Sequence, residues 1–369
     1  MLQGSLAAML GAPAVATASN EIRVVDMRGR EIALPRRPRR IALFDARDAL
    51  TMAILDPDPM RFVVGWTAPE MIDSDALIAS LKAAAGRDVP VIGGRAPGSI
   101  SIEAVVALQP DVVITTAYVE DGHGGLAERL AAFGIPVLFS DSATPGKGKQ
   151  DGDRLPALMR MWGTLLGREQ RAEAFLAFVE AKLNAVARCV QTEPRRKTYL
   201  EVQSTYDECC WAAGTRVWGD LLSQAGGRLP DAVTAPWFQE LHVEQLIVEQ
   251  PDIYIASGGA FAPGMRPAIA PGLSVPDAQR GLARLVARTG LESLSAVREG
   301  RVYGIWTGLI TVSPFQVLFV EQAAKWLHPQ ACKALEPDRM LAELNARFLA
   351  VPLEGPIWAR LGPVEPGTQ

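Results

Sequence analysis

The chain has 369 residues, of which 49% are hydrophobic and 21% are charged, and its formal net charge at pH 7 is −4. This length and composition are ordinary for a globular protein and allow two or three domains. The isoelectric point of about 5.6 and the absence of any basic tract longer than Pro35–Arg40 argue against nucleic acid as the main partner.

Residues 1–20 have the character of a leader. Leu6–Ala18 is small and apolar, and Ala16-Thr17-Ala18 fits a signal-peptidase site. No lysine or arginine precedes Arg23, so the basic start of a secretory signal is missing, and a disordered leader is the alternative. We expect an exported, periplasmic protein. No apolar run in the sequence has the length of a transmembrane helix.

Residues 21–153 predict a first αβ lobe. Ile22–Leu34 has the alternation of a hairpin that turns at Arg28-Gly29. The strands predicted after it are Arg40–Phe44, Arg61–Gly65, Val89–Gly93, Asp111–Thr115 and Ile135–Phe139. The predicted helices are Arg47–Leu55, a helix that carries Glu103 behind an N-cap at Ser101, and Gly125–Phe133. Strands that alternate with helices indicate a mainly parallel sheet covered on both faces, and the polar Ser140–Asp153 is a loop that ends the lobe.

Residues 154–190 predict a connecting helix. Apolar residues recur at helical spacing from Leu155 to Val190, and Gly163 and Gly167 are the positions at which the helix could bend. A continuous helix of this length would be roughly 50 Å long at 1.5 Å per residue. One long helix between two lobes acts as a strut and restricts their relative movement.

Residues 191–369 predict a second αβ lobe. The expected elements are the strand Arg196–Ser204, the helix Trp218–Ala225 ending at Gly226-Gly227, the loop Gly258–Gly272, a helix around Ala278–Arg288, the strand Arg301–Ile305 and the helix Pro314–Leu327. From Ala331 to Gly362 we expect a last helix and an extended end.

A helix–turn–strand unit occurs twice. Ile102–Thr116, IEAVVALQPDVVITT, is matched by Val243–Ser257, VEQLIVEQPDIYIAS, and both have Gln-Pro-Asp at the same distance from a glutamate. In each copy a short amphipathic helix is stopped by proline and leads into an apolar strand. The offset of 141 residues is too long for a solenoid repeat, so the pattern favours two similar lobes. Chance similarity of two αβ units is the alternative.

The two glutamates, Glu103 and Glu244, fall in the first turn of the repeated helix. The helix dipole favours an acid there, and this explains either residue taken alone. As an equivalent pair on two rigid lobes, they would form two anionic projections that could dock onto arginines of a partner.

The four cysteines, Cys189, Cys209, Cys210 and Cys332, lack the C-x-x-C spacing of a zinc or redox site. In an exported protein they could form up to two disulfides. We predict Cys189–Cys332, because one residue ends a long helix and the other follows a late helix. Cys209 and Cys210 would then be either free thiols or a vicinal disulfide, and four reduced thiols are the alternative.

Catalytic patterns are absent from the sequence. There is no G-x-S-x-G, H-E-x-x-H, P-loop, or G-x-G-x-x-G after a strand. The three histidines are His123, His242 and His328. Tyr118, Glu120, Asp121 and His123 could bind a metal, but a solvated acidic loop is the simpler interpretation. We predict neither an enzyme nor a resident metal or cofactor.

Aromatic and arginine side chains follow several predicted strands. In open α/β sheets, ligands bind beyond the carboxyl ends of the strands. Tryptophan offers flat apolar area, and arginine is a forked donor for carboxylate or hydroxamate oxygens. The pattern predicts a cleft for a large, partly apolar and anionic ligand, and burial in the core is the alternative for each residue taken singly. The predicted ligand-contacting residues are Arg47, Trp66, Arg95, Tyr118, Tyr206, Trp211, Trp218, Trp237 and Trp306.

An ordered set of motifs between Ile22 and about His328 resembles the periplasmic substrate-binding proteins of ABC importers for iron–siderophore complexes and cobalamin, the class III type with a helical backbone. The motifs are PRRIALF near Arg40, IEAVVALQPDVVITT, LAERLAAFGIPVLF, WGTLLGREQRAEAF, VWGDLLSQAGG, VEQLIVEQPDIYIAS and VREGRVYGI. The resemblance implies an α/β fold of two mainly parallel αβ lobes joined by one long backbone helix, with the ligand in the cleft between the lobes. It also implies a monomeric carrier that docks through Glu103 and Glu244 onto arginines of an inner-membrane ABC permease.

The ligand implied by this resemblance is a ferric siderophore, which the arginines favour. Cobalamin, haem or another metal chelate, and a role as a ligand sensor, are the alternatives. The clustered histidines of the related zinc and manganese binders are absent, which disfavours a bare divalent metal. Because ligand contacts vary within the family, none of the pocket residues is assigned by motif.

Overall fold

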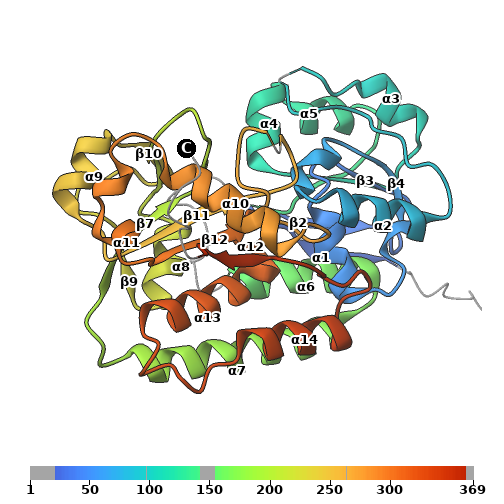
Figure 1. Ribbon diagram of the computed structural model, residues 1–369. Coiled ribbons are helices and arrows are strands. Elements are labelled where there is room, and N and C mark those ends of the chain that lie inside the picture. Colours follow the sequence, from blue (N-terminus) through green and yellow to red (C-terminus); the bar gives the residue numbers. More distant parts are fainter. Residues whose placement is uncertain (1–20, 97, 142–153, 263, 363–369) are drawn as a thin grey trace, which may run out of the picture.

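Two αβ lobes lie side by side above a long helix in the computed structural model, which describes residues 21–362 apart from residues 97, 142–153 and 263 (Figure 1). The predicted leader and nearly all of the predicted loop Ser140–Asp153 fall outside the described residues. The expected fold class, α/β with two lobes joined by a long backbone helix, is confirmed.

Lobe one contains a parallel sheet of four strands in the order β4-β3-β5-β6. These strands are β3 (Ile41–Leu43), β4 (Val63–Trp66), β5 (Val112–Thr115) and β6 (Val137–Phe139). A separate antiparallel hairpin is formed by β1 (Ile22–Val25) and β2 (Glu31–Leu34), as predicted. The helices of the lobe are α1 (Asp48–Leu55), α2 (Asp75–Ala85), α3 (Ile102–Ala107), α4 (Ala117–His123) and α5 (Leu126–Ala131). Every residue of β3, β4, β5 and β6 is buried, as expected for a sheet covered on both faces.

Lobe one differs from the predicted elements at three positions. Val89–Gly93 makes only a single bridge, between Trp66 and Val91, and is not a full strand. Helix α2 was not predicted, although Ser74 caps it by accepting a hydrogen bond from the Leu77 backbone N–H at 3.2 Å. The acidic segment after Thr116 is helix α4 and not a loop, because the Thr116 hydroxyl accepts the Val119 N–H at 3.2 Å.

The repeated unit folds alike in both lobes. It forms α3 and β5 in lobe one, and α9 (Val243–Glu249) and β11 (Ile253–Gly258) in lobe two. The glutamine that ends each helix has left-handed backbone, with φ of 46° at Gln109 and 43° at Gln250. The aspartate that follows then accepts a backbone N–H at the start of the neighbouring strand: Asp111 from Arg40 and Asp252 from Lys197, both at 3.0 Å. Gln-Pro-Asp therefore has the same structural role in both lobes, and chance similarity is the weaker explanation.

Lobe two contains a mixed sheet in the order β10-β8-β7-β11-β12-β13, with β9 paired to β7. Its remaining strands are β7 (Arg196–Glu201), β8 (Trp211–Ala213), β9 (Gly227–Arg228), β10 (Phe238–Glu240), β12 (Val302–Trp306) and β13 (Trp358–Arg360). β7, β11 and β12 are parallel, whereas β8, β10 and β13 pair antiparallel. The helices are α8 (Trp218–Gln224), α10 (Val275–Val286), α11 (Ser295–Arg298), α12 (Gly308–Thr311), α13 (Gln316–Leu327) and α14 (Pro337–Arg347). The predicted extended end is the edge strand β13.

The connecting segment consists of two helices, α6 (Arg154–Leu166) and α7 (Glu169–Val190). The chain turns at Gly167, whose φ is +65°, and α6 packs back against α7. Gly163 makes this close approach possible, since a Cβ built there would lie 3.1 Å from the Ala172 Cβ. The 22 residues of α7 make the long backbone helix, about 33 Å at 1.5 Å per residue.

Helix α7 is attached to both lobes. At its start, the Arg171 guanidinium donates hydrogen bonds to the Ile54 carbonyl at the end of α1 and to the Phe348 carbonyl after α14. At its end, Cys189 forms a disulfide with Cys332. The C-terminal part of the chain also returns beneath lobe one, where the Ala350 N–H donates to the Ala53 carbonyl at 3.0 Å. The segment 191–369 therefore contributes to both ends of the molecule (Figure 1).

A second contact between the lobes is centred on Asp73, which follows a 3₁₀ turn in lobe one and is 6% exposed. Its carboxylate pairs with Arg266 at 3.0 Å and accepts the Phe261 N–H at 2.9 Å. Its carbonyl accepts the Trp306 indole N–H at 3.0 Å. A Cβ built at Gly259 would lie 2.0 Å from this carboxylate, so only glycine allows the approach.

Both cysteine pairs are bonded. The predicted bridge Cys189–Cys332 is confirmed, and Cys209 and Cys210 form a vicinal disulfide. The alternative of four reduced thiols is therefore wrong.

Candidate ligand-binding cavity

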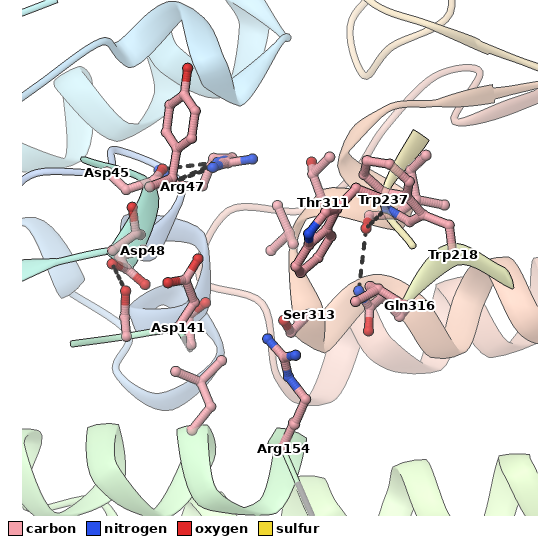
Figure 2. Close-up of a pocket in the computed structure, with 18 of the residues that line it drawn as sticks. Asp45, Arg47, Asp48, Asp141, Arg154, Trp218, Trp237, Thr311, Ser313 and Gln316 are labelled. Carbon is pink, nitrogen blue, oxygen red and sulfur yellow. Dashed lines mark hydrogen bonds and ion pairs between the residues drawn. The ribbon is translucent and has the colours of Figure 1, made fainter. Parts of the chain in front are cut away.

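A cavity of about 690 Å³ lies between the two lobes, above helix α6 (Figure 2). Lobe one contributes Asp45, Arg47, Asp48, Thr51, Thr116, Tyr118, Asp121, Ser140 and Asp141. Helix α6 contributes Arg154 and Leu158, and lobe two contributes Val217, Trp218, Ala235, Pro236, Trp237, Phe238, Ile310, Thr311, Val312, Ser313 and Gln316. This volume is within the range of small-molecule sites, roughly 300–1,000 Å³.

The lobe-one wall is built where strands β3, β5 and β6 end. Asp45 and Arg47 follow β3, and Asp48 begins α1. Arg47 is bound to Asp45: its backbone N–H, Nε and Nη2 all donate to the Asp45 carboxylate, at 3.0, 2.9 and 2.5 Å. The Asp48 carboxylate accepts the Ser140 hydroxyl at 2.8 Å, and Asp141 accepts the Ala117 N–H at 2.9 Å.

The aspartates of this wall have different proton affinities. Burial would raise the pKa of Asp45, but the charge and hydrogen bonds of Arg47 outweigh it and hold that pKa below its ordinary value. Burial raises the pKa of Asp48 well above its ordinary value, and the negative charge of Asp45 adds to the effect. Burial also raises the pKa of Asp141, against the hydrogen bond from Ala117. Asp45 is therefore the ionised partner of Arg47, while Asp48 and Asp141 hold protons more tightly than an exposed aspartate.

The lobe-two wall is aromatic and is fixed by backbone contacts. Trp218 begins α8, and its indole N–H donates to the Ile310 carbonyl at 3.1 Å. Trp237 is held against Gly214, whose N–H donates to the Trp237 carbonyl at 2.7 Å. A Cβ built at Gly214 would lie 2.4 Å from the Trp237 backbone, so glycine is required there. Phe238 extends this wall and packs edge-on against Trp211, with ring centroids 5.6 Å apart.

Four of the predicted ligand-contacting residues line the cavity: Arg47, Tyr118, Trp218 and Trp237. Trp211 stands one layer behind them, against Phe238. Figure 2 shows the tryptophans of lobe two facing the aspartates of lobe one across the cavity, with Arg154 rising between them from α6.

The other predicted residues lie elsewhere. Trp66 and Trp306 are 0% exposed and belong to the core, since both are last residues of buried strands and turn inward. Arg95 is on an exposed loop, with its guanidinium 5.8 Å from the centre of the Phe261 ring. Tyr206 lies under Arg284, outside the cavity lining.

The acidic character of the cavity was not predicted from the sequence. Asp48, Asp141 and Arg154 all line the cavity but were not predicted. Asp48 and Asp141 follow predicted strands at the same sheet edge as Arg47, so their positions carried the signal. The expected arginine donor for an anionic ligand is instead engaged by Asp45, because that aspartate lies two residues before Arg47.

The lining residues that the structure describes include no histidine and no cysteine. His242 and His328 lie in lobe two, away from the cavity lining, and the His123 side chain is outside the described parts. Glu201, Cys209 and Cys210 come close together, but the two sulfurs are bonded to each other and offer no thiolate. The chemistry of this cavity suits an organic ligand better than a bare transition-metal ion.

Glu103 and Glu244 lie in α3 and α9, on the outer flanks of the two lobes and away from α7 (Figure 1). Both side chains are exposed. The pKa of Glu103 is lowered, because its own backbone N–H and the Ser101 hydroxyl donate to the carboxylate. The fold thus presents the two glutamates at equivalent positions, one on each lobe.

Residues 52–306 match the family model of periplasmic binding proteins, which spans both lobes and the connecting helices. The chain belongs to this family. It is the two-lobe class III type, and the family consists of substrate-binding proteins rather than enzymes. Within the described residues, no helix is both long and apolar enough to cross a membrane.

Solved structures of other periplasmic binding proteins have the same fold. The TroA-like periplasmic binding protein FepB of Veillonella parvula matches with a TM-score of 0.78 and 22% identity, over 92% of this chain and 100% of that one. A protein of an ABC-type Fe³⁺-hydroxamate transport system from Saccharomonospora viridis matches with a TM-score of 0.60 and 21% identity, over 83% of this chain and 98% of that one.

Among curated proteins, a vitamin B12-binding protein of Photorhabdus laumondii is 27% identical over 161 residues, which are 43% of this chain and 54% of that protein. A vitamin B12-binding protein of Vibrio parahaemolyticus is 27% identical over 165 residues, which are 44% of this chain and 55% of that protein. The chain thus spans about half the length of the curated relatives it matches.

Proposed function

We propose that this periplasmic binding protein captures a ferric siderophore or a similar iron chelate in the periplasm and delivers it to an ABC permease of the inner membrane. The observation that carries the proposal is the cavity of about 690 Å³ with an aromatic wall. A cavity of this size and lining accommodates an organic chelate, whereas a bare ion needs converging ligand atoms at short range.

The comparisons support this ligand class in part. Similar folds include a protein of a ferric hydroxamate transport system and a haem-binding protein of Pseudomonas aeruginosa. The curated relatives bind vitamin B12, so a corrinoid is the second candidate. Both candidates are large chelates with apolar surface, which Trp218 and Trp237 could cover.

The first experiment is a titration of intrinsic tryptophan fluorescence with ferric siderophores, ferric citrate, haem and cobalamin, corrected for absorbance by the ligand. Because Trp218 and Trp237 line the cavity, a bound chelate will quench them. We expect saturable quenching by one ferric chelate at submicromolar concentration, with no response to its iron-free form. Saturation by cobalamin alone would favour the corrinoid, and silence across the panel, repeated by calorimetry, would refute capture of a metal chelate.

A further inference from the structure

The described lining of the cavity has more acidic side chains than basic ones. Four aspartates line it, namely Asp45, Asp48, Asp121 and Asp141, against two arginines, Arg47 and Arg154. With every group ionised, four negative and two positive charges leave a formal charge of −2.

The two arginines do not compensate all four carboxylates. The Arg47 guanidinium donates from both Nε and Nη2 to the Asp45 carboxylate, so its hydrogen-bonding fork is already occupied. Arg154 rises from α6 toward the middle of the cavity (Figure 2), and its positive charge favours ionised Asp141. Even so, burial outweighs this charge and the pKa of Asp141 stays above its ordinary value. Asp48, which is 8% exposed, has the Ser140 hydroxyl as its hydrogen-bond donor.

We infer that the cavity selects a chelate with net positive charge, whose cationic part faces Asp48 and Asp141 and whose apolar framework lies against Trp218 and Trp237. This inference rests on the proposed function and narrows its ligand class. It reverses the anionic ligand expected from the arginines alone.

The acidic wall and the aromatic wall together favour a cationic chelate over other ligands. A small inorganic cation would satisfy the aspartates but leave the two indole faces exposed to water. An anionic chelate would cover the indoles but add charge of the same sign to the lobe-one wall, which is costly at short range. A cationic chelate contacts both walls favourably, and the indole faces also attract positive charge.

The acidic wall makes binding dependent on pH. The groups that face Asp48 and Asp141 are Asp45 and Arg47 after β3, Tyr118 and Asp121 on α4, Ser140 after β6, and Arg154 on α6. A positive ligand favours the ionised carboxylates, so its binding releases protons from Asp48 and Asp141. Its affinity will therefore rise with pH through their titration range and level off above it, whereas a neutral analogue will change little.

The test uses ligands that share one framework and carry end groups of different charge. Ferric complexes of a linear trihydroxamate with a terminal ammonium, acetamide or succinamate group carry charges of +1, 0 and −1, and aquocobalamin and cyanocobalamin form a second pair, +1 and 0. We expect about a tenfold loss of affinity for each unit of positive charge removed.

Substitutions at Asp48 and Asp141 test whether the lobe-one wall causes the preference for the cationic ligand. Asp141→Asn and Asp48→Asn should each reduce the preference for the cationic member by about tenfold, and retained binding of the neutral member shows that they fold. Asp88→Asn, an exposed aspartate of lobe one outside the cavity lining, is the matched control and should leave the preference unchanged. Equal or reversed affinities across a series that binds would overturn the charge inference alone. Failure of both series to bind would overturn the proposed function together with this inference.

Discussion

At the scale of single residues, the aromatic wall depends on tight backbone contacts. Gly214 and Trp237 come so close that no other residue fits at position 214. Next to them, Val217 has a φ of 56°, a backbone conformation that is rare for a β-branched residue, and it too lines the cavity. Unfavourable local geometry of this kind persists only where the surroundings enforce it. These residues therefore give the wall a fixed shape before any ligand arrives.

This fixed wall leads to a prediction for Trp237 and Arg95. Trp237→Ala removes a large flat surface from the cavity and should weaken ligand binding by about tenfold or more, with little change in the melting temperature because the side chain is only partly buried. Arg95→Ala is the matched control. From the sequence this variant was expected to lose affinity, but the exposed position of Arg95 outside the cavity predicts none. Calorimetric titration of both variants with the same chelate checks the pair, and equal losses would contradict the position of the site.

At the scale of elements, the junction of α6 and α7 is the most sensitive to side-chain size. Gly163→Leu would insert a branched side chain where only 3.1 Å separates a Cβ from Ala172. We expect this overpacking to lower the free energy of unfolding by roughly 1–3 kcal/mol, although leucine is the better helix former.

The control for this prediction is Gly122→Leu in α4, since a Cβ built at Gly122 has no neighbour within 4 Å. Chemical denaturation of both variants checks the prediction. A Gly163→Leu protein as stable as the Gly122→Leu protein would show that α6 can move away from α7 at no cost.

The elements that were predicted correctly from the sequence are determined by residues close together in the chain. The Gln-Pro-Asp units were found because helix, stop and strand follow each other within 15 residues. Short strands such as β8 and β10 were missed, since they exist through pairing with other segments and have no strong alternation of their own. The same limit applies to the site. Four of the nine predicted ligand residues line the cavity, because position after a strand does not tell whether a side chain turns outward, like Trp237, or inward, like Trp306.

At the scale of the whole molecule, several contacts among the described residues tie the two lobes together. Helix α7 contacts both lobes below the cavity, and Asp73 joins lobe one to Phe261, Arg266 and Trp306 of lobe two. A buried ion pair with two further hydrogen-bonded groups is broken only at considerable cost. We therefore expect the lobes to move little on ligand binding, so that the spacing of Glu103 and Glu244 stays nearly constant.

A constant spacing suits recognition by a rigid partner. If the protein docks as proposed, reversing both charges, Glu103→Lys with Glu244→Lys, should abolish uptake of the chelate in cells, because each lysine would repel a basic docking surface on the permease. Ligand affinity in solution should be unchanged, since neither residue lines the cavity. The control is Glu292→Lys, which reverses the charge of another exposed glutamate of lobe two. Glu249 is not chosen because its carboxylate pairs with Lys197. Loss of affinity in the double variant would mean that the glutamates support the fold or the site.

The Cys189–Cys332 disulfide can form only late in synthesis and only in an oxidising compartment. Its cysteines are 143 residues apart, so the bridge closes only after most of the second lobe has been synthesised. Disulfides form in oxidising compartments and are kept open in the reducing cytosol. With the proposed periplasmic location, exported chains will therefore migrate faster on a non-reducing gel than chains still in the cytosol. The state of this disulfide would therefore report export of the untagged protein.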